Sequence, residues 1–112
     1  MTGRPSGSGL DPVFAALGDP TRREILVAIG RCRDTTATEL AADLPVSRQA
    51  VAKHLHALAV AGLVGSERIG REQRFHLTPA PLGDAARWMV DVGAAWDDRL
   101  DRLRRRSEDQ PQ

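Results

Sequence analysis

The sequence contains very little cysteine and few aromatic residues. Cys32 is the only cysteine among 112 residues, which excludes an intrachain disulfide and a zinc site made of cysteines alone. Tyrosine is absent, and aromatic residues make up 4% of the chain. No apolar run approaches the roughly 18 residues of a membrane-spanning helix, and residues 1–9 lack the apolar stretch of a secretory signal. We therefore expect one small cytoplasmic domain without membrane contact, in which Cys32 is a packing residue.

The sequence also lacks the common patterns of catalytic sites. The phosphate-binding patterns Gly-x-Gly-x-x-Gly and Gly-x-x-x-x-Gly-Lys are absent, and no nucleophile is paired with a base. His54 and His56 are two residues apart on a predicted helix, so their side chains point about 200° apart and cannot share a metal. His76 stands alone on a predicted strand. We therefore expect no enzymatic activity, no metal and no cofactor.

Charge is unevenly distributed along the chain. Residues 45–78 carry five cationic and two acidic side chains, whereas the flanking segments 1–44 and 79–112 each have one more acidic than cationic side chain. A basic segment between acidic ends suits a nucleic-acid reader, because cations displace phosphate counterions. An unevenly charged, solvated surface fits these numbers equally well.

Hydrophobic periodicity and cap residues predict four short helices in the first half of the chain. They span about 12–17, 20–29, 37–44 and 48–61. Asp11 and Asp19 each precede a proline and are suited to N-caps. Thr36 or Thr38 is expected to cap the third helix, and Ser47 the fourth.

The segment after the fourth helix predicts a β-hairpin. Gly62 can adopt the left-handed conformation that ends the helix. Residues 63–69 and 73–77 then form two runs around a glycine-containing turn at 70–72. Two short helices joined by residues 44–47 and followed by a hairpin predict a winged helix-turn-helix.

One long helix is predicted over residues 82–103, after a segment rich in proline. Its apolar positions recur at intervals of three and four residues, as in a coiled coil. So small a core cannot cover this stripe, and large apolar side chains are costly to expose. We therefore expect the first and last helices to form a homodimer interface through Val13, Phe14, Leu82, Trp88, Met89, Val92, Trp96 and Leu100. The alternative is that the two tryptophans pack only within the monomer.

These elements define the expected fold class and domain organisation. The class is mainly α with a small β-hairpin, a winged helix-turn-helix with a long C-terminal helix. Residues 10–103 form one DNA-binding and dimerisation domain. Small polar residues at 1–9 predict a disordered arm, and residues 104–112 predict a flexible tail.

The fourth predicted helix has two chemically different faces. Val51, Leu55 and Leu58 form the apolar face. The opposite face consists of Gln49, Ala52, Lys53 and His56. Small Ala52 would let this face approach another molecule closely.

The polar residues of this helix suit contacts with double-stranded DNA. Arginine and glutamine form paired hydrogen bonds with guanine and adenine, so we assign Arg48 and Gln49 to base edges. A helix N-terminus favours a phosphate. We therefore expect Ser47, Lys53 and His54 to contact the DNA backbone, and His56 lies on the same exposed side.

The predicted hairpin carries a second group of cations. Arg68, Arg71 and Arg74 bracket its tip, and Glu67 and Glu72 reduce its net positive charge. We expect Arg71, in the turn, to make the principal DNA contact of the three. Arg74 could instead pair with Glu67 across the strands.

Several motifs occur in one order along the chain. They are FAALGDPTRREIL at 14–26, ELA at 39–41, VSRQAVAKHL at 46–55, Leu58 with AGLV at 61–64, and FHLT at 75–78. In this order, over residues 10–103, they resemble the ArsR/SmtB-type (arsenic-repressor-like) bacterial transcription regulators. The resemblance implies a homodimer paired through the first and last helices and a wing that reaches phosphates or the minor groove. Two-fold symmetry then predicts a near-palindromic operator with half-sites about one turn (~10 bp) or a multiple apart.

The chain departs from this family at the usual metal sites. Thiolates of soft-metal sensors correspond to Thr36 and Thr38 here, and a hydroxyl is a poor ligand for such metals. Another type of site uses carboxylates and histidines of the last helix, which has no histidine here. The signal is therefore open between a small organic effector at the dimer interface, oxidation of Cys32, and protein concentration alone.

The expected function is that of a sequence-specific DNA-binding transcription regulator, a dimeric repressor that responds to an unknown, non-metal signal. The alternative is a winged-helix protein-interaction module without specific DNA readout. Such a module would lack cations on the exposed face of its recognition helix, and Arg48, Lys53 and Arg71 argue against it.

Overall fold

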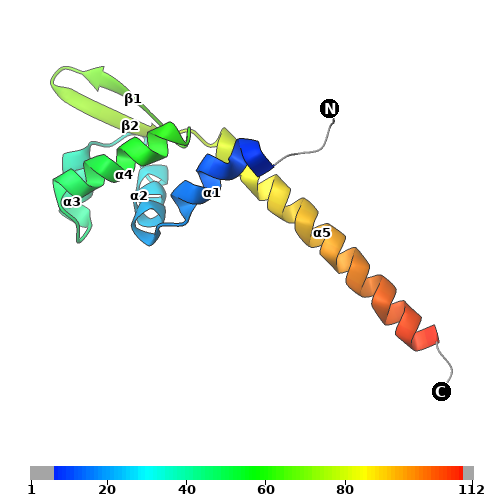
Figure 1. The fold of residues 1–112 in the computed structure, drawn as a ribbon. Helices are drawn as coiled ribbons and strands as arrows, with labels where there is room; N and C mark the ends of the chain where they lie inside the picture. The colour runs from blue at the N-terminus through cyan, green and yellow to red at the C-terminus, as the bar shows by residue number, and fades with distance from the viewer. Residues whose placement is uncertain (1–6, 110–112) are drawn as a thin grey trace.

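Four short helices and a hairpin form one cluster, from which a long helix projects (Figure 1). The computed structural model describes residues 7–109. The elements in chain order are η1 (Gly7–Leu10), α1 (Asp11–Leu17), α2 (Pro20–Gly30), α3 (Ala37–Asp43), α4 (Arg48–Val60), β1 (Val64–Ile69), β2 (Glu72–Leu77) and α5 (Ala80–Asp109). This order confirms the predicted winged helix-turn-helix with a long last helix. Because α5 extends well beyond the cluster, the molecule measures 73 × 36 × 21 Å.

Side-chain caps fix where three of the helices begin. The Asp19 carboxylate accepts hydrogen bonds from the backbone N–H groups of Thr21 (2.8 Å) and Arg22 (3.2 Å). The Arg22 N–H is the largest cause that holds the pKa of Asp19 below its ordinary value. Thr36 caps α3, and Ser47 caps α4 by accepting from the N–H of Ala50. Of the two threonines predicted to cap α3, the structure thus selects Thr36.

The prediction that Asp11 is an N-cap is wrong. Asp11 is the first residue of α1, the N-cap is Leu10, and no side chain caps this end. The reason is η1, which begins helical backbone one turn earlier and shifts the helix start. Helix α2 ends one residue later than the predicted range of 20–29, because Gly30 is its last residue and Arg31 is the C-cap.

Two glycines adopt the left-handed conformation that their positions require. Gly62 has φ of 79° and follows α4, which confirms the predicted helix stop. Gly70 has φ of 62° and occupies the first position of the two-residue turn between β1 and β2. Glycine at this position is typical of a type II′ hairpin turn.

The hairpin is joined to the helical cluster through its second strand. β1 and β2 pair antiparallel from Val64 opposite Leu77 to Ile69 opposite Glu72. On the other edge of β2, the main chain of Thr35 exchanges two hydrogen bonds with Phe75, of 2.9 and 2.7 Å. This short bridge anchors the hairpin to the segment before α3.

One hydrophobic core lies between the four short helices, the start of β1 and the first turns of α5. Its buried residues are Val13, Ala16, Ile25, Leu26, Ile29, Leu40, Val51, Leu55, Leu58, Leu63, Val64 and Ala85. Val13 is 2% exposed, so the prediction that it belongs to a dimer interface is wrong. Its own subunit already covers its side chain.

Helix α5 is longer than the sequence pattern predicted. It starts at Ala80 and continues through Asp109, so residues 104–109 of the expected tail are helical. Ion pairs between neighbouring turns support this end, including Arg102 with Asp98 (3.0 Å) and Arg104 with Asp101 (3.8 Å). Residues 7–9 of the expected arm lie in η1, while residues 1–6 and 110–112 lie outside the described part. No helix within residues 7–109 is both long and apolar enough to span a membrane.

Candidate nucleic-acid interface

Helix α4 presents the two predicted faces. Val51, Leu55 and Leu58 are at most 1% exposed and form part of the core. The opposite face, made of Gln49, Ala52, Lys53 and His56, is exposed, and Arg48 is exposed in the first turn of the helix. Within residues 7–109, no ion pair involves Arg48 or Lys53. Both cations are therefore available to an external anion.

The first turn of α4 is held against α3 by one side-chain contact. Arg48 Nε donates a hydrogen bond of 3.1 Å to Thr38 Oγ1. Both side chains are exposed, and they line a groove of about 430 Å³ with Ala52, Arg71 and other residues of α3, α4 and the hairpin. From the sequence, Thr38 is only a possible cap of α3 and, by the family resemblance, occupies the position of a metal-binding thiolate. A contact across ten residues between two helices leaves no local sequence signal.

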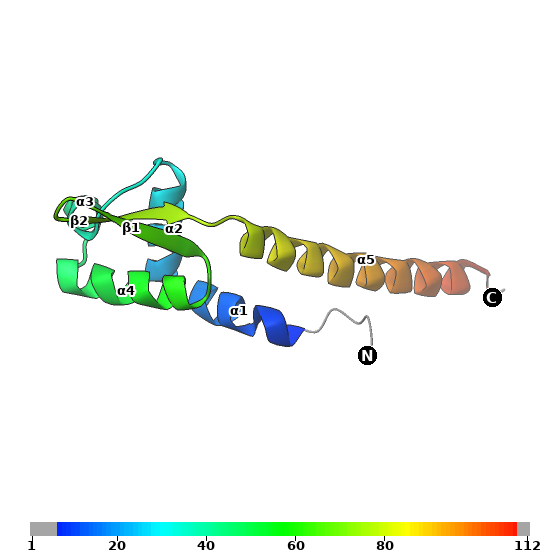
Figure 2. The same cartoon turned by 90° about the horizontal axis from the view of Figure 1, so that it is seen from above.

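The hairpin tip carries two exposed cations. Arg71 lies in the turn beside Gly70, and Arg68 lies on β1 opposite Gln73. Neither arginine forms an ion pair with any residue in the described part of the chain. Figures 1 and 2 show the hairpin, α3 and α4 together at the end of the molecule opposite the C-terminus of α5. The free cations of α4 and of the hairpin thus belong to the same end.

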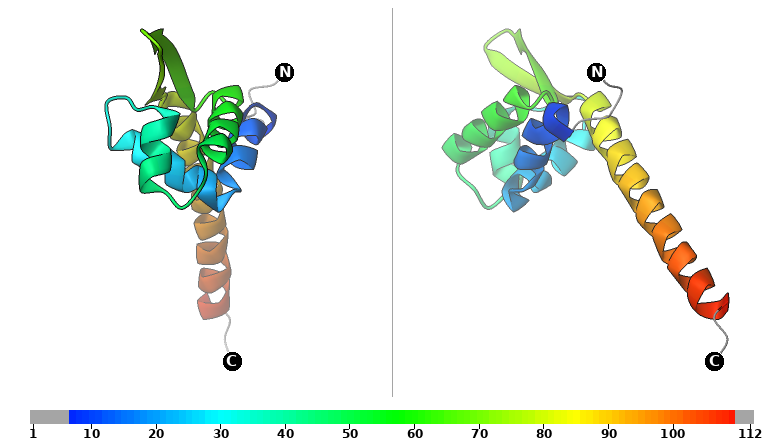
Figure 3. Two further views of the ribbon diagram at one scale, coloured as in Figure 1. Left: turned by 90° about the vertical axis from the view of Figure 1, so that its left-hand side faces the viewer. Right: turned by 45° about the vertical axis from the view of Figure 1, so that its right-hand side comes forward.

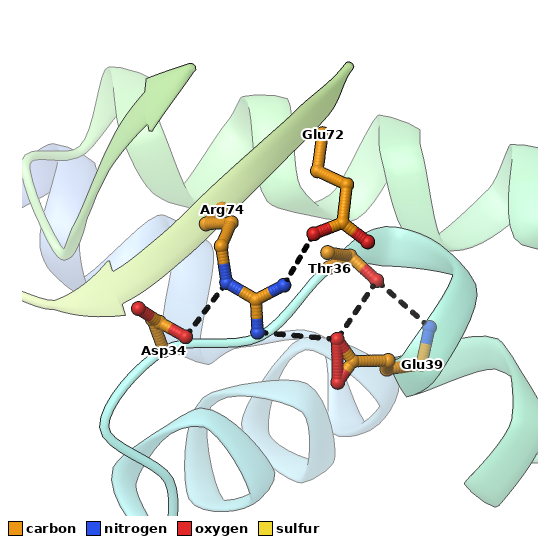
Figure 4. A network of polar contacts seen from close by, with 5 residues as sticks. All are labelled: Asp34, Thr36, Glu39, Glu72 and Arg74. Carbon is orange, nitrogen blue, oxygen red and sulfur yellow. Dashed lines mark hydrogen bonds and ion pairs between the residues drawn. The ribbon is translucent and has the colours of Figure 1, made fainter. Parts of the chain in front are cut away.

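Arg74 differs from the other two arginines of the hairpin, because it is bound to three carboxylates (Figure 4). Its Nε lies 2.8 Å from Asp34 Oδ1, its Nη2 3.2 Å from Glu39 Oε1, and its Nη1 2.8 Å from Glu72 Oε1. The hydrogen bond to Asp34 is the largest cause that raises the pKa of Arg74 above its ordinary value. The alternative that Arg74 pairs with Glu67 is wrong, although the two residues are opposite in the strand register.

This network changes the role expected of Arg74. All three guanidinium nitrogens are engaged within the protein, so the expectation of a free cation for DNA is contradicted. Arg74 instead joins β2 to the segment before α3 and to α3 itself. Glu39 is held from a second side as well, because Thr36 Oγ1 donates to Glu39 Oε1 at 3.3 Å (Figure 4).

His54 is also engaged within the protein. Its side chain is half-buried, and its Nδ1 accepts a 3.3 Å hydrogen bond from Arg22 Nε on α2. The expected contact between His54 and a DNA phosphate is therefore not available through Nδ1. His56, one helical half-turn away, is exposed as predicted.

A second candidate surface lies on α5. Near its start, Leu82 is half-buried against the core, and Trp88 packs on Phe14 with ring centroids 5.3 Å apart. Beyond this point the apolar stripe is exposed by 38–55%, at Met89, Val92, Trp96, Leu100 and Leu103. Trp88 therefore packs partly within its own subunit, whereas Trp96 does not. The assignment of both tryptophans to a dimer interface stays a prediction. Figure 3 shows this part of α5 without a neighbouring element.

The remaining residues singled out from the sequence lie apart from these surfaces. Cys32 follows α2 and is exposed, so the expectation that it packs in the core is wrong. Thr36 is buried and serves as the cap of α3. Among residues 7–109, no group of three or more histidine, cysteine, aspartate or glutamate side chains is arranged to hold a metal ion.

Comparison with known proteins identifies the family. Residues 17–67 match a family described as a helix-turn-helix domain. The HTH-type transcriptional regulator YuzN of Bacillus subtilis (strain 168) is 38% identical, over 72% of this chain and 95% of its own. The transcriptional repressor SdpR of the same organism is 32% identical, over 73% and 90%.

A solved structure agrees with this relationship. An ArsR-like transcriptional regulator from Rhodococcus sp. RHA1 is 48% identical and superposes with a TM-score of 0.84, over 94% of this chain and 95% of its own. The resemblance inferred from the ordered motifs is therefore confirmed. The chain belongs to the ArsR family of winged helix-turn-helix transcriptional regulators.

Proposed function

We propose that this protein is a sequence-specific repressor that binds near-palindromic double-stranded DNA as a homodimer. One observation supports it above the others. The exposed side of α4 carries cations without acidic partners beside those of the hairpin tip, while Arg74 binds Asp34, Glu39 and Glu72. Cations without acidic partners of their own are the groups that replace phosphate counterions on DNA.

The roles of the individual residues follow from their positions. Arg48 and Gln49, in the first turn of α4, suit hydrogen bonds to base edges in the major groove. Ser47 and Lys53 suit phosphate contacts, with His56 beside them. Arg68 and Arg71 suit the DNA backbone or the minor groove next to the hairpin.

A second copy of the chain is the proposed partner for α5. The stripe from Met89 to Leu103 leaves several large apolar side chains half exposed, which is costly in water. Pairing with its symmetry mate would cover them and would relate two α4 helices by a two-fold axis. Half-sites about one turn (~10 bp) or a multiple apart then follow. The name of the relative SdpR supports repression as the outcome.

The proposed signal is not a metal, and no catalytic activity is proposed. Thr36 is committed to capping α3, and Thr38 accepts a hydrogen bond from Arg48. Neither hydroxyl is a ligand that soft metals prefer. A small organic effector at the dimer interface, oxidation of the exposed Cys32, or regulation by protein concentration alone are the remaining possibilities.

A gel-shift experiment with the DNA upstream of the protein's own gene tests the proposal. We expect a complex with two subunits per site that survives excess unrelated DNA and weakens linearly on a plot of log affinity against log salt. Equal affinity for unrelated DNA would contradict sequence-specific binding and would favour the alternative of a protein-interaction module.

A further inference from the structure

The contact between Thr38 and Arg48 connects the two helices of the helix-turn-helix at its exposed end. We propose that Thr38 is a specificity-determining positioning residue, whose hydroxyl aims the guanidinium of Arg48 at a guanine. This inference rests on the proposed function, because it assumes that α4 reads DNA. It adds a residue of α3 to the recognition machinery, although α3 itself has no assigned base contact.

The geometry of the contact determines which edge of the guanidinium remains free. Arginine has five N–H donors in a rigid planar fork. Arg48 Nε is occupied by Thr38 Oγ1 at 3.1 Å, so Nη1 and Nη2 form the available end. Two parallel N–H donors at that end match the O6 and N7 acceptors of guanine in the major groove.

Thr38 is itself fixed in position by the elements around it. It lies in the first turn of α3, two residues after the buried Thr36 that caps this helix. Its neighbour Glu39 is bound to Arg74 of β2, and Thr35 is paired with Phe75 of the same strand. The hydroxyl therefore belongs to a segment that is also bound to the hairpin. It gives Arg48 a defined orientation relative to α3 and to the hairpin.

The charge around Arg48 explains why a hydroxyl is the suitable partner. Glu39 and Glu72 line the same groove as Arg48, and each would attract its guanidinium. Arg74 binds both carboxylates, at 3.2 and 2.8 Å, and so competes for them. Arg48 thus pairs with a neutral acceptor and retains its charge and its terminal donors for DNA.

Orientation before binding affects specificity more than affinity for DNA in general. An oriented arginine loses less conformational freedom when it meets guanine. When Arg48 faces a base other than guanine, its terminal N–H donors lack acceptors, which is unfavourable at a desolvated interface. A freely moving Arg48 could turn to a nearby phosphate instead, and discrimination would fall.

The test measures base discrimination, since a merely structural role would not alter it selectively. The wild-type protein first selects an operator from a random DNA pool, and Arg48→Ala identifies the base pair whose preference it relaxes. Thr38→Val removes the hydroxyl at nearly constant shape, and Thr38→Ala is a second variant in case the first folds poorly. Thr38→Ser keeps the hydroxyl, and the double variant Thr38→Val with Arg48→Ala shows whether Thr38 acts through Arg48.

We expect Thr38→Val to lower discrimination at that base pair by about fivefold per half-site, or about 25-fold when both subunits contact the site. Thr38→Ser should retain the wild-type preference, and Thr38→Val should have no further effect in the Arg48→Ala background. Unchanged discrimination by both Thr38→Val and Thr38→Ala would overturn the proposal. An equal loss of affinity for all sequences, or a Thr38→Ser variant that behaves like Thr38→Val, would overturn it too. If the wild-type protein selects no DNA sequence from the pool, the proposed function itself is contradicted. This outcome is distinguishable from a failure of the Thr38 proposal alone, in which the wild type still selects an operator.

Discussion

Replacement of Trp96 by alanine is the sharpest test of the proposed dimer. Trp96 is 55% exposed on α5, at the centre of the uncovered stripe. A tryptophan can bury up to about 250 Å², so roughly 140 Å² remains for a partner to cover. At about 25 cal/mol per Å² this area corresponds to about 3.5 kcal/mol per subunit, of which the smaller alanine side chain retains a part.

The expected effect on the dimer is therefore large. Two copies change together, so the free energy of association should fall by about 4–6 kcal/mol, which raises the dissociation constant at least ~1000-fold. Sedimentation equilibrium over nanomolar to micromolar protein concentrations measures this constant directly. Because Trp96 lies outside the core of the monomer, the melting temperature of the dissociated chain should be nearly unchanged.

A matched control comes from the same helix. Val90 is 67% exposed but lies off the stripe, about 120° around α5 from its centre. Val90→Ala should leave the dissociation constant unchanged. A Trp96→Ala variant that dimerises as tightly as the wild type, or a wild-type protein that is monomeric at micromolar concentration, would refute the assignment of α5 to the dimer interface.

Three further outcomes concern stability and ligand binding. Arg74→Gln should lower the melting temperature, most strongly at low salt, because three carboxylates then lack their shared cation. The control Arg71→Gln removes a cation that has no carboxylate partner, so it should leave the melting temperature nearly unchanged. Because folding lowers the pKa of Asp19, the ionised carboxylate stabilises the folded state at pH values above its ordinary pKa of 3.8. This stabilisation is lost as the pH falls through the lower pKa of the folded state. In urea unfolding, the wild type should therefore have a higher free energy of unfolding than Asp19→Asn at pH 6, and the difference should disappear in acid. A difference that does not change with pH would contradict this. Zinc titration of untagged protein should reveal no stoichiometric site of sub-micromolar affinity, and finding one would overturn the assignment of a non-metal signal.

Local signals were sufficient to predict most of the secondary structure. The helix caps at Asp19 and Ser47 and the stop at Gly62 were found from residue type and position alone, as was the glycine-containing hairpin turn. Each depends on interactions within a few residues, which a sequence displays directly. The cap at Asp11 failed because the upstream turn η1 has no clear sequence signal.

The contacts that define the candidate interface could not be predicted in the same way. Arg74 meets Asp34 and Glu39, which are 40 and 35 residues away in sequence, through the bridge that brings Thr35 beside β2. No periodicity in the sequence indicates such a pairing. Arg74, which was expected to contact DNA, therefore forms ion pairs within the protein instead. Similarly, Val13 lies on a seven-residue helix, whose few apolar positions do not tell the core side from an interface side.

The division of roles between Arg48 and Lys53 is the central claim about how α4 reads DNA. Affinities of the wild type, Arg48→Ala and Lys53→Ala for the selected operator and a scrambled sequence, at several salt concentrations, test it most directly. Arg48→Ala should cost about 1–3 kcal/mol per half-site and relax the preference at one base pair. Lys53→Ala should weaken both sequences alike and reduce the slope of log affinity against log salt by about 1 for each phosphate that the lysine no longer neutralises. If neither variant changes affinity for either DNA, α4 is not the reading helix and the account is contradicted.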